Sequence, residues 1–115
     1  MFHSATKFNQ DISSWNTGNV TNMNGMFYQA TNFNQDIGSW DISNVVHFIS
    51  FMFGKTPSTF STANLDAIYN GWSTRLVKPG VSISFGNAKY TSASSAGRAI
   101  LTSAPNNWVI EDGGI

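Results

Sequence analysis

Large apolar residues follow the same order twice in the first half of the chain. Phe8, Ile12 and Trp15 are separated by Asn, Gln, Asp and Ser residues, and the same order returns in residues 33–40. The two stretches, "FNQDISSW" and "FNQDIGSW", lie 25 positions apart and differ at one letter. A match of this length indicates a structural unit that repeats about every 25 residues.

Two kinds of apolar spacing alternate within each unit. The octets place isolated apolar residues among Asn, Gln, Asp and Ser, with Gly in the second copy. Asn, Asp and Gly accept the backbone angles of tight turns, which predicts a short strand between turns. The next apolar residues are three or four positions apart, which favours one face of a short helix. The helical positions are Val20, Met23, Phe27 and Ala30, then Val45, Phe48 and Met52.

The two units resemble each other enough to stack. Residues 1–25 and 26–50 are identical at 13 of 25 positions, and a third unit begins with "FMF" at residues 51–53 and then loses the pattern. One unit holds too few large apolar side chains to offset the entropy lost on ordering it. We therefore expect stacked coils of a solenoid in which equal residues form columns. The expected columns are Phe8 on Phe33, Ile12 on Ile37 and Trp15 on Trp40.

The second half has a different pattern, which predicts a cap. Ser61 or Thr62 is a suitable N-cap for a helix that carries Leu65, Ile68 and Trp72 on one side. Alternation in residues 81–85 predicts a strand, residues 94–104 predict a helix ended by proline, and residues 108–110 predict a last strand. We assign residues 1–53 to the repeats and 54–115 to a capping segment continuous with them.

The repeat resembles a known family. The pattern MF-x-x-A-T-x-FNQDI-x-x-W, followed by N-V-T-x-M-x-x-MF, is similar to the BspA-like surface-protein repeats, a divergent branch of the leucine-rich repeats also known as the DUF285 family. The second copy departs from the pattern at Val46, His47 and Phe48, and residues 60–114 resemble the segment that often closes such arrays. The resemblance implies an α/β repeat solenoid with a short parallel strand and a short helix per coil, closed by an α+β C-terminal cap.

The other end of the expected stack has no cap. Met1 and Phe2 match Met26 and Phe27 in the middle of a unit, so the first coil is expected to expose apolar surface. Either further coils or another subunit would cover this end. We assign the docking end to Met1, Phe2 and Phe8, with a homo-oligomer as one outcome.

Charge and composition exclude several classes of function. The net charge is zero and 10% of residues are charged, so the clustered Lys and Arg of nucleic-acid binding are missing. There is no Cys, and no apolar run is long enough to span a bilayer, so we expect no membrane insertion. Residues 1–8 lack the pattern of a signal peptide, so the targeting segment of an exported protein is expected outside this chain.

Candidate chemistry is sparse. His3 and His47 occupy different slots of the repeat, which argues against a paired site. Asp11 and Asp36 fall in register with Asp41 nearby, so they could bind Ca²⁺, or they could accept hydrogen bonds from backbone N–H groups of their own coil. Whether Asp11 and Asp36 bind calcium stays open at this point.

Sequence motifs give no support for an enzyme or a cofactor. Neither a G-x-S-x-G nucleophile motif nor a glycine-rich phosphate-binding loop is present. Asn19-Val20-Thr21 matches a glycosylation sequon, but the same letters belong to the repeat. Trp15 and Trp40 recur at the repeat period, which favours packing in a column over stacking on a carbohydrate ligand.

The resemblance implies a non-enzymatic interaction or adhesion module, exposed on a bacterial surface or a phage particle, that binds a protein ligand or a host surface component. The alternative is a structural or assembly component, such as a virion decoration or fibre protein, that docks through its uncapped N-terminal coil. Polar residues of the two octets are the predicted interaction face, and these are Asn9, Gln10, Ser13, Ser14, Asn34, Gln35 and Ser39.

Overall fold

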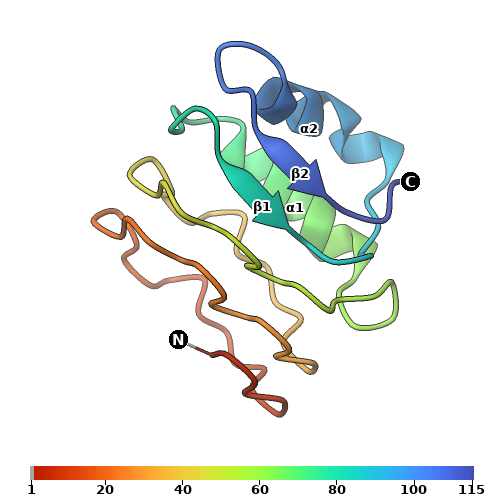
Figure 1. Cartoon of the computed structure of the whole chain (residues 1–115). Helices are drawn as coiled ribbons and strands as arrows, with labels where there is room; N and C mark the ends of the chain where they lie inside the picture. Colours follow the sequence, from red (N-terminus) through yellow and green to blue (C-terminus); the bar gives the residue numbers. More distant parts are fainter. Residues whose placement is uncertain (1) are drawn as a thin grey trace.

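The computed structural model describes residues 2–115 (Figure 1). Its regular elements all lie in the second half of the chain. They are helix α1 (Thr62–Trp72), strand β1 (Ser82–Ser84), a 3₁₀ helix η1 (Ser92–Ser94), helix α2 (Ser95–Thr102) and strand β2 (Val109–Glu111). The two strands are parallel, with Ile83 opposite Ile110. Residues 2–53 form turns and extended segments joined by isolated bridges.

Segments 25 residues apart lie side by side and form what we call the ladder. Asn22 pairs with His47 in a parallel bridge, and Phe48 pairs with Ile83 in another. Backbone N–H groups of one segment donate to carbonyls of the next, as from Met23 to His47 (2.7 Å) and from Phe27 to Phe51 (2.9 Å). The ladder comprises, in order, residues 2–4, 22–29, 47–53, 82–85 and 109–111.

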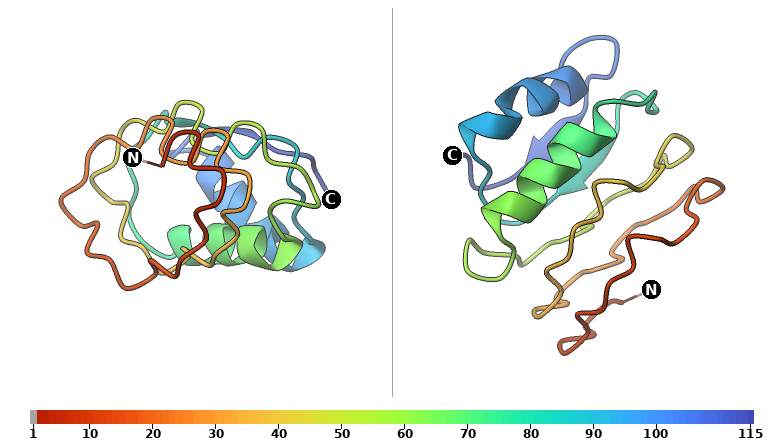
Figure 2. Two further views of the ribbon diagram at one scale, coloured as in Figure 1. Left: turned by 90° about the horizontal axis from the view of Figure 1, so that it is seen from below. Right: turned by 180° about the vertical axis from the view of Figure 1, so that it is seen from behind.

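The opposite side of the molecule is formed by the two octets and then by the two helices. We call residues 8–29, 33–53, 62–85 and 95–111 layers 1 to 4, because each contains one octet or helix followed by one ladder segment. In the left view of Figure 2 the successive segments lie roughly above one another, and in Figure 1 they follow one another from the N-terminus to β2.

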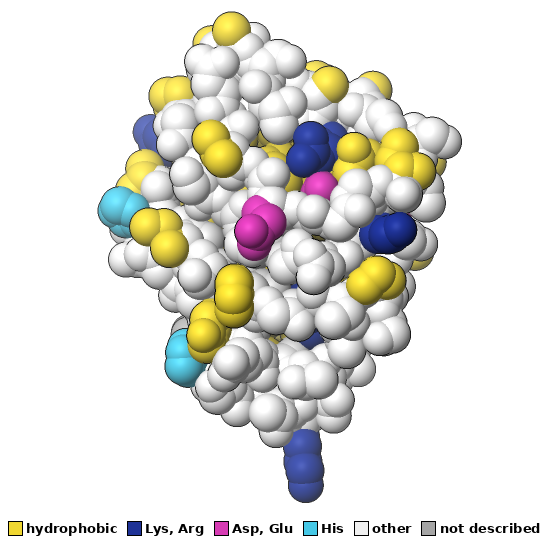
Figure 3. Space-filling model, turned by 45° about the vertical axis from the view of Figure 1, so that its right-hand side comes forward, with side chains coloured by type: hydrophobic (Ala, Val, Ile, Leu, Met, Phe, Trp, Pro, Cys, Tyr) yellow, Lys and Arg dark blue, Asp and Glu magenta, His cyan; other side chains and the backbone are white. Residues whose placement is uncertain are grey.

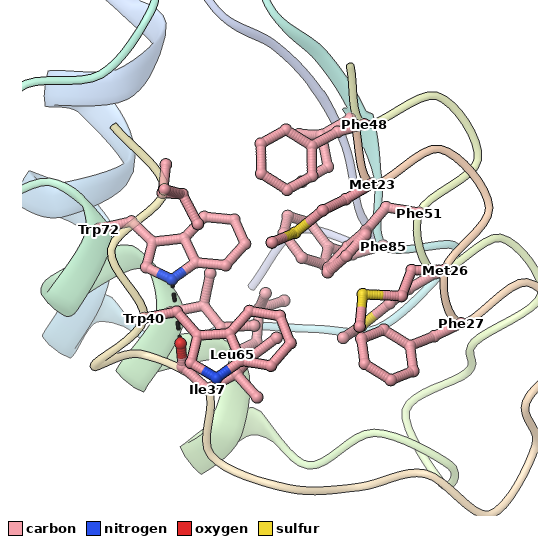
Figure 4. Packing of buried hydrophobic residues seen from close by; sticks show 14 of the residues in the cluster. Met23, Met26, Phe27, Ile37, Trp40, Phe48, Phe51, Leu65, Trp72 and Phe85 are labelled. Carbon is pink, nitrogen blue, oxygen red and sulfur yellow. Dashed lines mark hydrogen bonds between the residues drawn. The ribbon is translucent and has the colours of Figure 1, made fainter. Parts of the chain in front are cut away.

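Tryptophan side chains join the layers on the octet side. The indole Nε1 of Trp40 donates to the carbonyl oxygen of Ile12 at 3.0 Å. Trp72 on α1 repeats this bond one layer later, donating to the carbonyl oxygen of Ile37 at 3.0 Å (Figure 4). Helix α1 thus occupies in layer 3 the place that the octet occupies in layers 1 and 2.

Aromatic rings from successive layers stack between the ladder and the octets. The ring centroids of Phe8 and Phe33 are 5.8 Å apart, and those of Phe27 and Phe33 are 4.0 Å apart. In both pairs the two rings are nearly parallel. Ile12 and Ile37 are both buried in the same core. Figure 4 shows the methionine and phenylalanine side chains of the ladder pointing towards the tryptophans of the octet side.

The helix expected within each repeat unit is absent from residues 20–30 and 45–52. Gly25 and Gln29 have φ angles of +62° and +54°, values that no α-helix contains. The N–H groups of alternate residues from Met23 to Gln29 donate to the next layer instead of to their own turn. The expected strand is also elsewhere, since the bridges fall on the ladder and the octets belong to no strand.

The regular elements of the second half begin and end near their predicted bounds. Ser61 is the N-cap of α1 and its side chain accepts a hydrogen bond from the backbone of Asn64. Leu65, Ile68 and Trp72 are buried on one face of α1, as their spacing predicted. Helix α2 ends at Thr102, before Pro105.

One glycine explains the single letter that differs between the octets. A Cβ on Gly38 would lie 2.2 Å from the carbonyl oxygen of Ala67 on α1, and one on Gly71 would lie 2.0 Å from the carbonyl oxygen of Gly38. The backbones of layer 2 and α1 therefore touch at these glycines. Ser13 occupies the equivalent place in layer 1, where the next layer is another octet and not a helix.

Candidate interaction surfaces

The outer face of the ladder carries a column of aromatic rings. His3, Tyr28 and Phe53 occupy the same slot of the repeat, 25 residues apart. The ring of His3 stacks on Tyr28 with a centroid distance of 4.7 Å, and Tyr28 stacks on Phe53 at 5.4 Å, each pair within 10° of parallel. Phe53 is 46% exposed. We call these three rings the aromatic column.

A shallow groove lies on the last three segments of the ladder. Ile49, Ser82, Ser84, Val109 and Glu111 line this depression of about 240 Å³. Ile49 and Val109 are 60% and 67% exposed, which is high for large apolar side chains. Ser84 Oγ donates a hydrogen bond to Glu111 Oε1 across β1 and β2. Figure 3 shows hydrophobic, histidine and acidic side chains distributed over one face of the molecule.

A signal for the aromatic column is present in the sequence. An aromatic or imidazole ring returns at positions 3, 28 and 53, although the residue type changes each time. Identical letters in the two repeat units therefore do not reveal this column. Ile49 and Val109 belong to different layers, and their proximity in the groove follows only from the fold.

The predicted polar interaction face lies on the octet side, where part of it joins the layers. Asn9 Oδ1 accepts hydrogen bonds from the backbone N–H of Asn34 and from Gln35 Nε2, both at 2.9 Å. Asn34 Oδ1 accepts in the same way from the N–H of Ser61 (3.0 Å) and from Asn64 Nδ2 (2.8 Å). The acceptor oxygens of both asparagines are therefore directed at the next layer.

The remaining residues of that face are more accessible. Gln10, Ser14 and Ser39 are exposed, whereas Ser13 is half-buried and donates both its N–H and its hydroxyl to Asp11. Ser39 Oγ donates to the carbonyl of Ser13 at 3.4 Å. The structure thus brings the seven predicted residues to one side of layers 1 and 2, with several engaged in bonds within the protein.

The aspartates that could bind calcium accept local hydrogen bonds. Asp11 accepts from Ser13, and Asp36 accepts from the backbone N–H of Gly38 at 2.8 Å. The side-chain and backbone bonds from Ser13 lower the pKa of Asp11, and those from Ser43 lower the pKa of Asp41. Within residues 2–115 no three His, Asp or Glu side chains lie together as metal ligands. Asp11 and Asp36 thus accept hydrogen bonds from N–H groups of their own coil, which is the alternative to calcium binding given by the sequence.

The predicted docking end contains a stacked phenylalanine pair. Phe2 and Phe8 are half-buried, with ring centroids 3.9 Å apart, and Phe2 also lies 5.7 Å from Phe27. Met1 lies outside the described residues. The two rings cover one part of layer 1, and Trp15 beside them is 41% exposed.

Lys55 is buried without a carboxylate near its ammonium group among the described residues. It is 3% exposed, and Nζ donates to the carbonyl oxygens of Ala30 (2.7 Å) and Phe33 (2.5 Å). Burial lowers the pKa of Lys55 to about 8. Position 55 matches Ala5 and Ala30 in the earlier repeat units, so the lysine is specific to the segment that connects layer 2 to the helical layer 3.

A buried polar cluster fixes the end of β2 to both helices. Asp112 accepts hydrogen bonds from Tyr69 Oη of α1 at 2.6 Å and from Arg98 Nε of α2 at 2.9 Å. Burial and the neighbouring Asp112 raise the pKa of Tyr69. All three side chains make contacts within the protein, so this cluster is structural.

No helix of residues 2–115 is long and apolar enough to cross a membrane.

Comparison with known families supports the DUF285 part of the resemblance. The family model described as "Mycoplasma protein of unknown function, DUF285" matches residues 1–95. The chain belongs to the DUF285 family. No similar curated protein and no similar solved structure was found.

The DUF285 match extends well beyond the two recognisable octets. It passes through α1 and β1 and ends at the start of α2. This range agrees with the layer-to-layer bonds, which continue from the octets to Trp72 and from residues 47–53 to β1. The region that the DUF285 model matches therefore contains the helical layer 3 together with layers 1 and 2.

Proposed function

We propose that this DUF285 chain is a non-enzymatic interaction module, displayed on a cell or virion surface, that binds a protein ligand through the outer face of its ladder. The proposal includes a BspA-like, leucine-rich-repeat-like solenoid as its scaffold and adhesion as its role. Stacked repeats provide extended faces, and such faces are common binding surfaces of repeat proteins.

The observation that carries the proposal is the exposed apolar surface along the ladder. The aromatic column ends at Phe53, and the groove with Ile49 and Val109 lies in the adjoining ladder segments. Aromatic and aliphatic side chains of this kind form the buried centre of protein interfaces, with polar residues at the rim. Ser82, Ser84 and Glu111 supply such polar groups beside the groove.

The octet side supports binding less well. Its asparagine oxygens accept hydrogen bonds from the next layer, so a ligand would compete with bonds that join the layers. On the ladder's outer face, Asn24 Oδ1 accepts from the N–H of Ile49 at 2.7 Å and Ser84 bonds to Glu111, but the apolar side chains of Ile49, Phe53 and Val109 make no such bonds. A ligand can therefore bury these three apolar side chains without breaking a side-chain hydrogen bond of the protein.

A phage-displayed library of random peptides, selected on the immobilised chain, tests this proposal. We expect enriched peptides whose binding falls at least tenfold with Ile49→Asp or Phe53→Ser. Leu76→Ser is the matched control, because Leu76 is 90% exposed and lies outside the groove. Binding that depends instead on Gln10 and Ser14 would move the site to the octet side, and a selection without enrichment would count against a peptide-binding face.

A further inference from the structure

A polar depression of about 320 Å³ lies beside the segments that lead into the two octets, and we call it the polar pocket. Lys7, Asn9 and Asn34 line it, together with the hydroxyl-bearing residues Thr31 and Ser58. Neither an acidic side chain nor an aromatic ring is among its described lining residues, and Lys7 supplies their charge. The polar pocket shares no residue with the groove on the ladder, so it is a separate surface.

Two asparagines of the polar pocket have a fixed amide orientation. Asn9 Oδ1 lies 2.9 Å from the backbone nitrogen of Asn34, and Asn34 Oδ1 lies 3.0 Å from that of Ser61. A backbone N–H can only donate, so the side-chain atom opposite it must be the amide oxygen. Both Nδ2 groups are therefore left as donors, and neither has an acceptor within residues 2–115.

Lys7 adds a positive charge to these two donors. Its side chain is exposed, and it forms no ion pair with any residue that the structure describes. Ammonium and amide nitrogens donate hydrogen bonds and accept none. A ligand must therefore bring acceptor oxygens to this part of the polar pocket, and negatively charged oxygens make the stronger bonds.

A second positive charge lies behind the wall of the polar pocket. Lys55 Nζ donates to the carbonyl oxygens of Thr31 (3.3 Å) and Thr59 (3.5 Å), and both residues line the pocket. Burial lowers the pKa of Lys55 to about 8, so the ammonium group is mostly charged at pH 7. The carbonyl groups satisfy its N–H donors but do not neutralise its charge, so its field favours an anion on the other side of the wall.

We propose that the polar pocket binds an acidic sugar, whose carboxylate accepts hydrogen bonds from Lys7 Nζ and from the Nδ2 groups of Asn9 and Asn34. The hydroxyl groups of Thr31 and Ser58 can both donate and accept, so they match the hydroxyl groups of the sugar ring. The ligand uses the amide nitrogens and not the oxygens. The bonds that join the layers through the asparagine oxygens are therefore kept.

The size and lining of the polar pocket favour an acidic sugar over other anions. Its volume lies at the lower end of the range for small-molecule sites, and a lone carboxylate or phosphate would leave most of it empty. No aromatic side chain among the described lining residues could stack on the base of a nucleotide. Lys7 is the single cation among those residues, which matches a ligand with one negative charge.

A titration of the ¹⁵N-labelled chain with sodium glucuronate at pH 7 tests the proposal. The side-chain amide signals of Asn9 and Asn34 report directly on the two Nδ2 groups. We expect both signals to shift and to reach saturation together. Glucose, added at the same concentration with sodium chloride to match the ionic strength, should leave both signals in place because it lacks the carboxylate.

Asn9→Asp separates ligand binding from the stability of the fold. The variant keeps an acceptor oxygen for the N–H of Asn34 and for Gln35, and it replaces the Nδ2 donor by a negatively charged oxygen. We expect the Kd for glucuronate, followed on the Asn34 signal, to rise at least tenfold while the urea midpoint changes little. Lys7→Gln should raise the Kd at least threefold, because Lys7 is exposed and its loss removes one charge-assisted bond.

Asn16→Asp is the matched control for the change of charge. Asn16 is exposed, its Oδ1 accepts the N–H of Gly18 at 3.1 Å, and it lies outside the polar pocket. This variant should bind glucuronate with an unchanged Kd. Phe53→Ser should also leave the Kd unchanged, so the test is independent of the proposed protein binding on the ladder.

Three results would overturn the proposal. Glucuronate could cause no saturable shift of the Asn9 and Asn34 signals, or Asn9→Asp could bind it as tightly as the unchanged chain. A Kd for glucuronate no lower than the values for acetate and inorganic phosphate would show that the pocket takes small anions without recognising a sugar.

Discussion

Layers 1 and 2 stack in the same way as layers 3 and 4, although the backbone on the side opposite the ladder differs between the two pairs. All four contribute to one ladder, and the ladder bonds pass from residues 47–53 to β1 as they pass between the earlier layers. On the opposite side, layers 1 and 2 use an octet stabilised by Asp and Asn side chains, whereas layers 3 and 4 use α1 and α2.

The bond from tryptophan to the preceding layer is common to both kinds of layer. Trp40 makes it from an octet and Trp72 makes it from the last turn of a helix, with the same distance of 3.0 Å. The comparison teaches that the position of one indole and the spacing of the ladder are kept, while the backbone that carries the indole can change. Glycine at the boundary makes this change sterically possible.

The largest effect is expected from making the two octets identical. Gly38→Ser gives layer 2 the letters of layer 1, but its Cβ would lie 2.2 Å from the carbonyl oxygen of Ala67. Because backbone must move to relieve this contact, we expect a loss of about 3 kcal/mol or more in the free energy of unfolding, measured in urea. Ser13→Gly, the reciprocal control, should cost well under half as much. Equal losses would show that α1 does not contact layer 2 at Gly38.

Removal of an indole hydrogen bond is expected to lower the free energy of unfolding by a smaller amount. Trp40→Phe leaves the buried carbonyl of Ile12 without its donor and removes packing volume, so we expect the free energy of unfolding to fall by about 2–3 kcal/mol. Trp15→Phe, in layer 1, should cost less than about 1 kcal/mol because Trp15 makes no such bond within residues 2–115. The measurement is again the urea midpoint, and a similar loss for both variants would contradict the role of the bond.

The smallest effect is expected from the pH dependence of Lys55. Its pKa is about 8 in the folded protein and about 10.5 in the unfolded chain, so between these values the unfolded state binds more protons. Stability should therefore rise with pH from 8 to about 9.5, by about 1–2 kcal/mol. Below pH 8 both states carry the charge and the slope should vanish. Lys55→Met should abolish the rise, and a slope unchanged by this variant would assign it to another group.

The repeat period and the second-half elements were accessible from the sequence, because both depend on local signals. The duplicated octet gave the spacing of 25 residues, and Ser61 with the apolar residues after it gave the start and the buried face of α1. The resemblance to DUF285 repeats also identified the family of the chain correctly. These features involve either identical letters or residues close together in the chain.

The location of the ladder was not accessible in the same way. Apolar residues spaced by three and four around Met23 fit a helix as well as a series of turns, and only the positive φ angles of Gly25 and Gln29 decide between them. Lys55 and Asp112 were missed for a different reason. Each bonds to groups far away in the chain, such as Phe33 and Tyr69, so no local pattern marks it.

The indole bonds also set an order for assembly during synthesis. The carbonyl of Ile12 is made 28 residues before Trp40, and that of Ile37 is made 35 residues before Trp72. Each acceptor is therefore synthesised before the tryptophan that binds it. Neither the bond of Trp40 nor that of Trp72 requires a residue translated later, so both bonds can form in the order in which layers 1 to 3 are synthesised.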